Sequence, residues 1–224
     1  MPAAVAPRME EILEARSLFA ADGPITFDQF LDWFGPADDV ELIDGVAQKR
    51  MAAQLDHERL SAFLVGLFVV FADDTGCGEV LGSRTAVRID PFHGRLPDLL
   101  FVRRERLHKL EQKGVRFAPD LVIEITSPGD RLSDVVGLEA DYRQIGVPEI
   151  VFIDQRRQEV RVTRKHPGDT GDDLEYTDEI IGPGEILRID CLNGMALPVD
   201  WLFVEPRPTV RAALAVLEST SSDT

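Results

Sequence analysis

The sequence predicts an α/β protein in which a mixed β-sheet is flanked by helices. Two apolar runs, Leu96–Val102 and Leu121–Thr126, have the composition of strands buried on both faces. A long helical pattern covers Asp56–Asp74, where apolar residues recur three and four apart. The order strand, helix, strand over Leu121–Asp154 favours a right-handed parallel crossover, so the two strands of this segment should be neighbours.

The chain divides into three parts by pattern: an N-terminal helical extension (residues 1–24), a core domain (25–204) and a C-terminal tail (205–224). The extension carries an amphipathic helical pattern at Ala3–Ala21, followed by the breaker Asp22-Gly23-Pro24. A length of 224 residues with 44% hydrophobic content is ample for a sizeable core.

The first half of the core domain contains several short elements. Thr26–Phe34 opens with a capping-box signal, Thr26 and Gln29, and predicts a helix. Val40–Val46 predicts a strand that enters an Asp-Gly turn of a hairpin. His57 lies in the first turn of the long helix, where a lone histidine is usually a surface or capping residue. Glu79–Asp90 predicts one or two strands, and Pro91–Arg95 a loop.

The second half alternates strands with one helix. Ser133–Ile145 predicts a helix, and Glu149–Asp154 and Glu159–Arg164 predict strands joined by a short turn. The remaining elements are three short strands that would form C-terminal β-hairpins, a terminal helix and a disordered end: Glu175–Ile181, Ile186–Ile189, Met195–Val199, Val210–Leu217 and Glu218–Thr224.

Acidic residues mark both buried strands. Glu124 interrupts the apolar run Leu121–Thr126, and an unpaired carboxylate buried in this way would cost several kcal/mol. Asp98 stands at the entrance of the other strand. Side by side, the two carboxylates could share a divalent cation with the oxygen ligands that suit magnesium. In the alternative interpretation, Asp98 and Asp120 are turn or capping residues that follow prolines.

Composition limits the partners and the compartment. The net charge of −16 argues against general attraction to a phosphate backbone, so nucleic-acid binding would need a local basic patch. Arg103, Arg104 and Arg106 begin such a patch, although a solvated helix face with internal ion pairs is an equally good interpretation. We expect a cytoplasmic protein without a membrane span. Cys77 and Cys191 lie too far apart to suggest a zinc site or a disulfide framework.

Six motifs taken in order resemble the Uma-two family of restriction-endonuclease-like proteins, within the PD-(D/E)XK nuclease superfamily. The resemblance spans roughly residues 25–203, and its specificity lies in the order of the motifs. The motifs are ELIDG at Glu41–Gly45, His57 at the start of the long helix, GEVLG at Gly78–Gly82, PDLLFV at Pro97–Val102, PDLVIEITSP at Pro119–Pro128 and YRQIGVPEIVFID at Tyr142–Asp154.

The resemblance implies a restriction-endonuclease-like core and metal-dependent cleavage of DNA phosphodiester bonds. It implies Asp98 and Glu124 as ligands of Mg²⁺ or Mn²⁺, with Glu41 as a further acid of the catalytic site. We further expect a homodimer. Asp98 and Glu124 are also the residues that the strand pattern singles out.

The superfamily's lysine is missing. Its usual position, two residues after the glutamate, is Thr126, and the position that this family uses instead is Leu138. Arg131 or Arg143 could substitute, but arginine's rigid fork differs from a lysine point charge. Three hypotheses therefore stay open: an endonuclease with impaired catalysis, an inactive nuclease-fold binding or regulatory module, and a structural oligomer in which Arg84 or Arg88 pairs with the acids.

Overall fold

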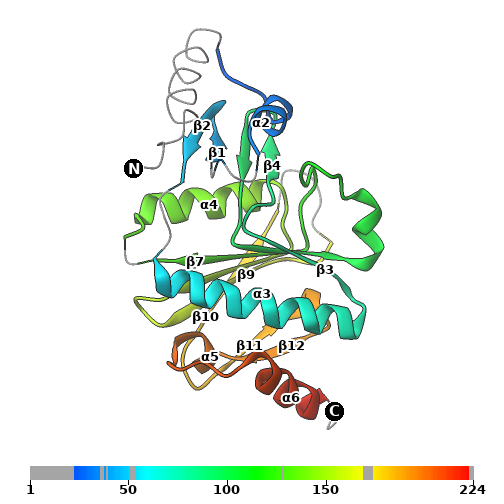
Figure 1. Cartoon of the computed structure of the whole chain (residues 1–224), viewed down its shortest axis with the longest axis vertical. Coiled ribbons are helices and arrows are strands. Elements are labelled where there is room, and N and C mark those ends of the chain that lie inside the picture. The colour runs from blue at the N-terminus through cyan, green and yellow to red at the C-terminus, as the bar shows by residue number, and fades with distance from the viewer. Residues whose placement is uncertain are drawn as a thin grey trace, which may run out of the picture.

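A six-stranded sheet lies at the centre of the described part of the chain and has helices on both faces (Figure 1). This computed structural model describes residues 23–35, 38, 40–50, 54–127, 129–168 and 174–221. Within these ranges, no helix is long and apolar enough to cross a membrane.

The central sheet is mixed, as the sequence predicts. Its strands are β3 (Gly78–Gly82), β6 (Leu99–Arg103), β7 (Leu121–Thr126), β8 (Glu149–Asp154), β9 (Glu159–Lys165) and β10 (Tyr176–Ile181). They lie in the order β10-β9-β8-β7-β6-β3. β7 and β8 run parallel, which confirms the predicted neighbours, whereas the other adjacent pairs run antiparallel.

Two long helices cover opposite faces of this sheet: α3 (Leu55–Thr75) and α4 (Leu132–Gln144) (Figure 1). Side chains alternate along β7, so Leu121, Ile123 and Ile125 share a core with α3. Val122 packs instead in the cluster that contains Tyr142 of α4. Glu124 follows the same alternation, and its side chain therefore faces α4.

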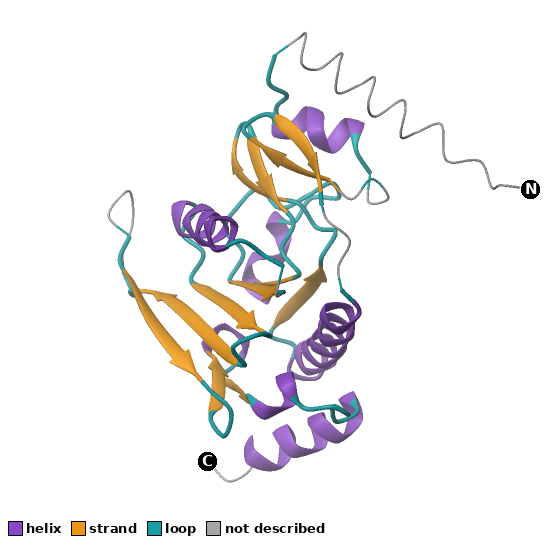
Figure 2. Ribbon diagram, turned by 90° about the vertical axis from the view of Figure 1, so that its left-hand side faces the viewer, coloured by secondary structure: helices purple, strands orange, loops and turns teal. Residues whose placement is uncertain are grey.

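A smaller sheet sits at one end of the molecule (Figure 2). It consists of β1 (Val40–Ile43), β2 (Val46–Lys49), β4 (Val87–Asp90) and β5 (His93–Arg95), in the order β2-β1-β5-β4. The predicted hairpin between β1 and β2 is confirmed, and its turn residues Asp44 and Gly45 have φ angles of 50° and 76°. Helix α2 (Phe27–Trp33) packs on this sheet and has the predicted capping box between Thr26 and Gln29.

The C-terminal elements form a separate layer below α3 (Figure 1). The predicted hairpin is present as an antiparallel pair, β11 (Ile186–Ile189) and β12 (Met195–Pro198). Ala213 and Leu217 of the last helix join the core that lines α3. The other elements of this layer are η2 (Asp190–Leu192), α5 (Asp200–Phe203) and α6 (Val210–Ser221).

Two sequence expectations need correction, and a third falls outside the described residues. The segment predicted as a loop, Pro91–Arg95, contains strand β5, which pairs with β1 and β4. Helix α6 extends to Ser221, so the disorder expected from Glu218 onward is wrong for the first part of that segment. The expected helix at Ala3–Ala21 falls outside the described residues.

Candidate active site

Asp98 and Glu124 lie opposite each other on neighbouring strands. The antiparallel register pairs Leu99 with Ile123, and one further step along each strand places Asp98 across from Glu124. Both side chains are buried, with 3% and 6% of their surface exposed. The structure therefore brings together the two acids that the sequence singles out.

Glu124 is held by α4. Its Oε1 accepts a hydrogen bond of 2.5 Å from the hydroxyl of Tyr142, and its Oε2 has no hydrogen-bond partner in the described part of the chain. Burial, and next the charge of Asp98, raise the pKa of Glu124 well above its ordinary value. Burial also raises the pKa of Tyr142, so this phenol stays a hydrogen-bond donor at neutral pH.

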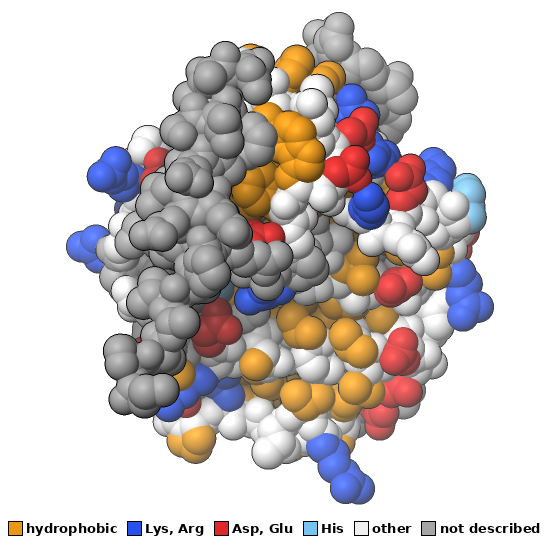
Figure 3. Space-filling model, turned by 45° about the horizontal axis from the view of Figure 1, so that its top comes forward, with side chains coloured by type: hydrophobic (Ala, Val, Ile, Leu, Met, Phe, Trp, Pro, Cys, Tyr) orange, Lys and Arg blue, Asp and Glu red, His pale blue; other side chains and the backbone are white. Residues whose placement is uncertain are grey.

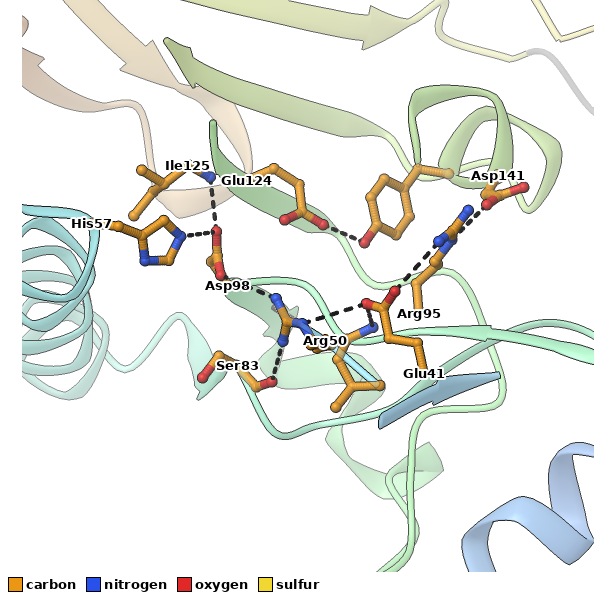
Figure 4. Close-up of polar contacts among 11 residues, drawn as sticks. Glu41, Arg50, His57, Ser83, Arg95, Asp98, Glu124, Ile125 and Asp141 are labelled. Carbon is orange, nitrogen blue, oxygen red and sulfur yellow. Dashed lines mark hydrogen bonds and ion pairs between the residues drawn. The ribbon is translucent and has the colours of Figure 1, made fainter. Parts of the chain in front are cut away.

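Asp98 is held from two sides (Figure 4). Its Oδ2 accepts a hydrogen bond of 2.8 Å from the backbone N–H of Ile125 and lies 3.0 Å from Nε2 of His57. The hydrogen bond to Asp98 raises the pKa of His57. The sequence interpretation of His57 as a surface or capping residue was wrong, because the first turn of α3 directs this imidazole at the strand end.

Arg50, just after β2, is the arginine nearest to these acids among the contacts that the structure gives (Figure 4). Its Nη2 lies 3.6 Å from Asp98 Oδ1, and its Nε lies 3.8 Å from Glu41 Oε1. Its Nη1 donates a hydrogen bond of 3.3 Å to the carbonyl of Ser83. Sequence reasoning missed Arg50, because the segment before α3 carries no periodic signal that would direct it at the sheet.

Glu41 lies between Arg50 and a second arginine. Its Oε1 accepts a hydrogen bond from the backbone N–H of Leu96 at 3.2 Å, and its Oε2 lies 3.4 Å from Nη1 of Arg95. Both carboxylate oxygens of Glu41 are thus engaged by protein groups. The structure places this predicted acid beside the site, where it pairs with Arg50 and Arg95.

Arg95 also belongs to a second charged cluster, on the α4 side. Its Nε donates to Asp141 Oδ2 at 2.7 Å, and His93 Nε2 lies 3.1 Å from the same oxygen. Nδ1 of His93 lies 3.4 Å from Asp44 Oδ1. The Asp141 carboxylate beside the imidazole raises the pKa of His93. This cluster joins β5, the β1–β2 turn and α4.

The positions expected for a lysine are apolar or neutral here. Leu138 is partly buried against the cluster that contains Tyr142, one turn further along α4. The hydroxyl of Thr126 contacts the carbonyl of Ile153 at 3.4 Å. Of the two suggested substitutes, Arg143 pairs with Glu139 at 2.6 Å, and Arg131 is an exposed residue at the start of α4.

The basic stretch lies at the other end of β6 from Asp98. Arg104 and Arg106 belong to the short helix η1 (Arg104–Lys109), and Arg103 precedes it. Arg103 lies five residue steps along the extended strand from Asp98, about 16 Å away. Arg106 Nη1 pairs with Asp120 Oδ1 at 2.8 Å, and its guanidinium lies over the ring of Phe117. The structure therefore does not place these arginines beside the two acids.

Most of the chain matches the model of a known family. Residues 27–200 match the model of the family described as "Uma2: Putative restriction endonuclease". The chain belongs to the Uma2 family. This result confirms the resemblance drawn from the six sequence motifs.

A solved structure shares the fold of this Uma2 protein. It is titled as a putative nuclease belonging to DUF820 from Anabaena variabilis ATCC 29413. The two are 22% identical with a TM-score of 0.62, and the match covers 80% of this chain and 98% of the other. The likeness confirms the restriction-endonuclease-like fold. A search among curated proteins found no match.

The donor set of the Uma2 site fits a divalent cation of the magnesium type. Asp98 and Glu124 offer carboxylate oxygens, and a bound cation would relieve the repulsion that contributes to the raised pKa of Glu124. Magnesium is commonly bound by one or two carboxylates together with waters and substrate phosphate. In the described ranges, no group of three or more His, Cys, Asp or Glu side chains is arranged to hold a metal, so water and substrate would complete the shell.

Proposed function

We propose that this Uma2 protein is a metal-dependent endonuclease that hydrolyses DNA phosphodiester bonds at Asp98 and Glu124. The observation that carries the proposal is the placement of these two buried carboxylates opposite each other, each fixed by a hydrogen bond from a neighbouring helix. Membership of a family described as "Putative restriction endonuclease" supports DNA as the substrate.

Asp98 and Glu124 would hold Mg²⁺ or Mn²⁺, which when bound supplies a Lewis acid for the phosphate and lowers the pKa of water. In hydrolysis, a water oxygen bonds to phosphorus while the ester P–O bond breaks. One water proton ends on the leaving oxygen as a hydroxyl, and the other stays on the phosphate monoester or passes to solvent. The chain's own contribution is orientation, because His57, the Ile125 N–H and Tyr142 fix the carboxylates before substrate arrives.

A second candidate is an inactive nuclease-fold module that binds DNA or a regulatory partner. The observation that favours it is the absence of lysine at both Thr126 and Leu138. Such a module would still hold a metal through the same two acids, but it would not cut DNA.

The test is nicking of supercoiled plasmid DNA with Mg²⁺, Mn²⁺ or EDTA. We expect nicking with either metal and none with EDTA, and a loss of at least about a hundredfold in Asp98→Asn and Glu124→Gln. Glu105→Gln is the matched control, because this exposed glutamate lies on η1 at the far end of β6. Metal binding without nicking would favour the inactive module, and nicking that survives both active-site changes would refute the proposed site.

A further inference from the structure

Arg50 occupies the point where three acidic side chains converge. Its guanidinium lies 3.6 Å from Asp98 and 3.8 Å from Glu41, and its positive charge also acts on Glu124 by lowering that group's pKa against the larger effects of burial and Asp98. A quarter of its side chain, 25%, is exposed. A cation in this position is therefore held inside the site and can still be reached by a ligand from solvent.

The planar fork of Arg50 is fixed along three directions. Nε faces Glu41, Nη1 donates to the carbonyl of Ser83, and Nη2 is directed at Asp98 Oδ1 (Figure 4). The first contact comes from β1 of the small sheet and the second from the residue that follows β3 of the central sheet, and together they hold the guanidinium in place. The Nη2 edge therefore faces Asp98, which the proposed function makes a metal ligand.

We propose that Arg50 is a catalytic residue that donates hydrogen bonds from Nη2 to a non-bridging oxygen of the scissile phosphate. The inference rests on the proposed function, since it names a further residue of the same site. A phosphate bound beside Asp98 lies within reach of Nη2, and the arginine fork matches phosphate oxygens. Phosphoryl transfer needs a positive group that stabilises charge on those oxygens, and arginine supplies it in other phosphoryl-transfer enzymes.

Other cations near the site are directed elsewhere. Arg95 shares Glu41 with Arg50, but its Nε is engaged by Asp141. A Cβ built on Gly137 of α4 would lie 4.0 Å from Arg95 Nη2, so this arginine packs along the helix. Arg143 pairs with Glu139 and Asp178. Among these arginines of the described chain, Arg50 is the one that forms an ion pair with Asp98.

Glu41 acquires a positioning role in this arrangement. Its Oε1 contacts both Arg50 and the backbone N–H of Leu96, so the carboxylate ties the guanidinium to the segment that delivers Asp98. Glu41→Gln should therefore lower kcat through misplacement of Arg50, and it should leave metal affinity nearly unchanged.

The kinetic test compares the nicking rates of Arg50 variants with that of Arg188→Gln, a control on β11. We expect Arg50→Gln to lose about a hundredfold in kcat, and the control to match wild type. Free guanidinium should restore part of the activity of Arg50→Ala at constant ionic strength, whereas sodium should not. A role limited to folding would show no such rescue.

Arg50→Lys keeps the positive charge, and it is the variant to test if the neutral variants fail to fold. A lysine cannot contact Glu41, Ser83 and a phosphate together, so we expect kcat to fall about tenfold. A wild-type kcat in Arg50→Lys would overturn the inference, as would equal kcat values in Arg50→Gln and Arg188→Gln.

A binding measurement separates this inference from the proposed function. Anisotropy of a fluorescent DNA duplex in Ca²⁺ reports phosphate contact without cleavage, and Arg50→Gln should bind at least about tenfold more weakly than Arg188→Gln. If wild type binds the duplex but never nicks plasmid, hydrolysis is refuted. The Arg50 contact is then judged by the difference in DNA affinity between Arg50→Gln and Arg188→Gln. Equal affinities in the two variants would overturn the contact itself.

Discussion

At the level of single residues, Glu124 combines burial with a neighbouring negative charge. Its pKa is raised, so its ionised form is disfavoured in the fold, and the destabilisation appears as pH rises above the ordinary glutamate pKa. Glu124→Gln keeps the size of the side chain and an acceptor for Tyr142. Without metal, we expect the free energy of unfolding at pH 7.5 to rise by about 1 kcal/mol, measured by urea denaturation in EDTA.

The sign of that change separates two roles for Glu124. The gain should shrink at pH 4, where the carboxyl is largely protonated in both folded and unfolded chains. A loss of a few kcal/mol instead would mean that Glu124 belongs to a structural ion pair whose partner is stranded by the substitution.

His93 gives a second residue-level prediction. Its pKa is raised in the folded state by Asp141, so the charged pair stabilises the fold fully below the unfolded histidine pKa, about 6.5. This stabilisation is lost as pH rises through the folded pKa. His93→Gln should therefore reduce stability by about 1 kcal/mol more at pH 6 than at pH 9.

The pH 6 measurement lies in the correct window, because the pKa of Asp141 is lowered by His93 and Arg95 despite the opposing effect of burial. Asp141 therefore stays charged well below pH 6. His108→Gln on η1 is the exposed control. Equal losses at the two pH values in His93→Gln would show that the imidazole contributes packing and no charge.

At the level of elements, one face of helix α4, which carries Leu138 and Tyr142, is directed at the site. Tyr142 of that face reaches Glu124, and Leu138 lies one turn before it. A lysine at 138 would place an ammonium beside the acids, because its long stem allows the charge to reach them from a partly buried position. Leu138→Lys should raise the nicking rate by up to about a hundredfold, provided that Asp98 and Glu124 are intact.

Val136→Lys is the matched control for this helix. Val136 is 56% exposed, so its lysine adds the same charge without entering the core. An inactive and strongly destabilised Leu138→Lys, beside a normal Val136→Lys, would mean that position 138 serves only the core.

Elements with strong local signals could be predicted from the sequence. The apolar run of β7, the spacing of apolar residues in α3 and the Thr26 capping box each depend on nearby residues, and all three are confirmed. Strand β5 was missed because it is three residues long and begins after Pro91-Phe92. Its pairing with β1 joins segments about fifty residues apart, which local propensity does not record.

The candidate site was predictable only in part for the same reason. Glu124 and Asp98 were found because a carboxylate in an apolar strand is conspicuous in one dimension. His57 and Arg50 lie on segments 41 and 48 residues before Asp98, and no repeat or spacing links them to it. Their contacts follow from how the small sheet and α3 are placed against β6.

At the level of the whole molecule, the charge of −16 shapes any encounter with DNA. On the face shown in Figure 3, basic and acidic side chains are interspersed, without one broad basic surface among the described residues. DNA binding should therefore be weak.

A triple variant that neutralises Arg103, Arg104 and Arg106 tests where the phosphate contacts lie. If this basic stretch guides the backbone, the triple neutralisation should reduce the slope of log affinity against log salt by about one for each phosphate that these arginines neutralise. Arg106 also pairs with Asp120, so thermal unfolding should confirm that the variant is folded. An unchanged slope would place the contacts on other residues.

The most direct measurement of the metal site is calorimetric titration of the protein with Mn²⁺ and Mg²⁺. We expect wild type and Glu105→Gln to bind metal with equal affinity, and Asp98→Asn and Glu124→Gln to bind it at least about tenfold more weakly. Equal metal affinity in all four proteins, or no metal binding by wild type at millimolar concentrations, would contradict a metal centre formed by Asp98 and Glu124.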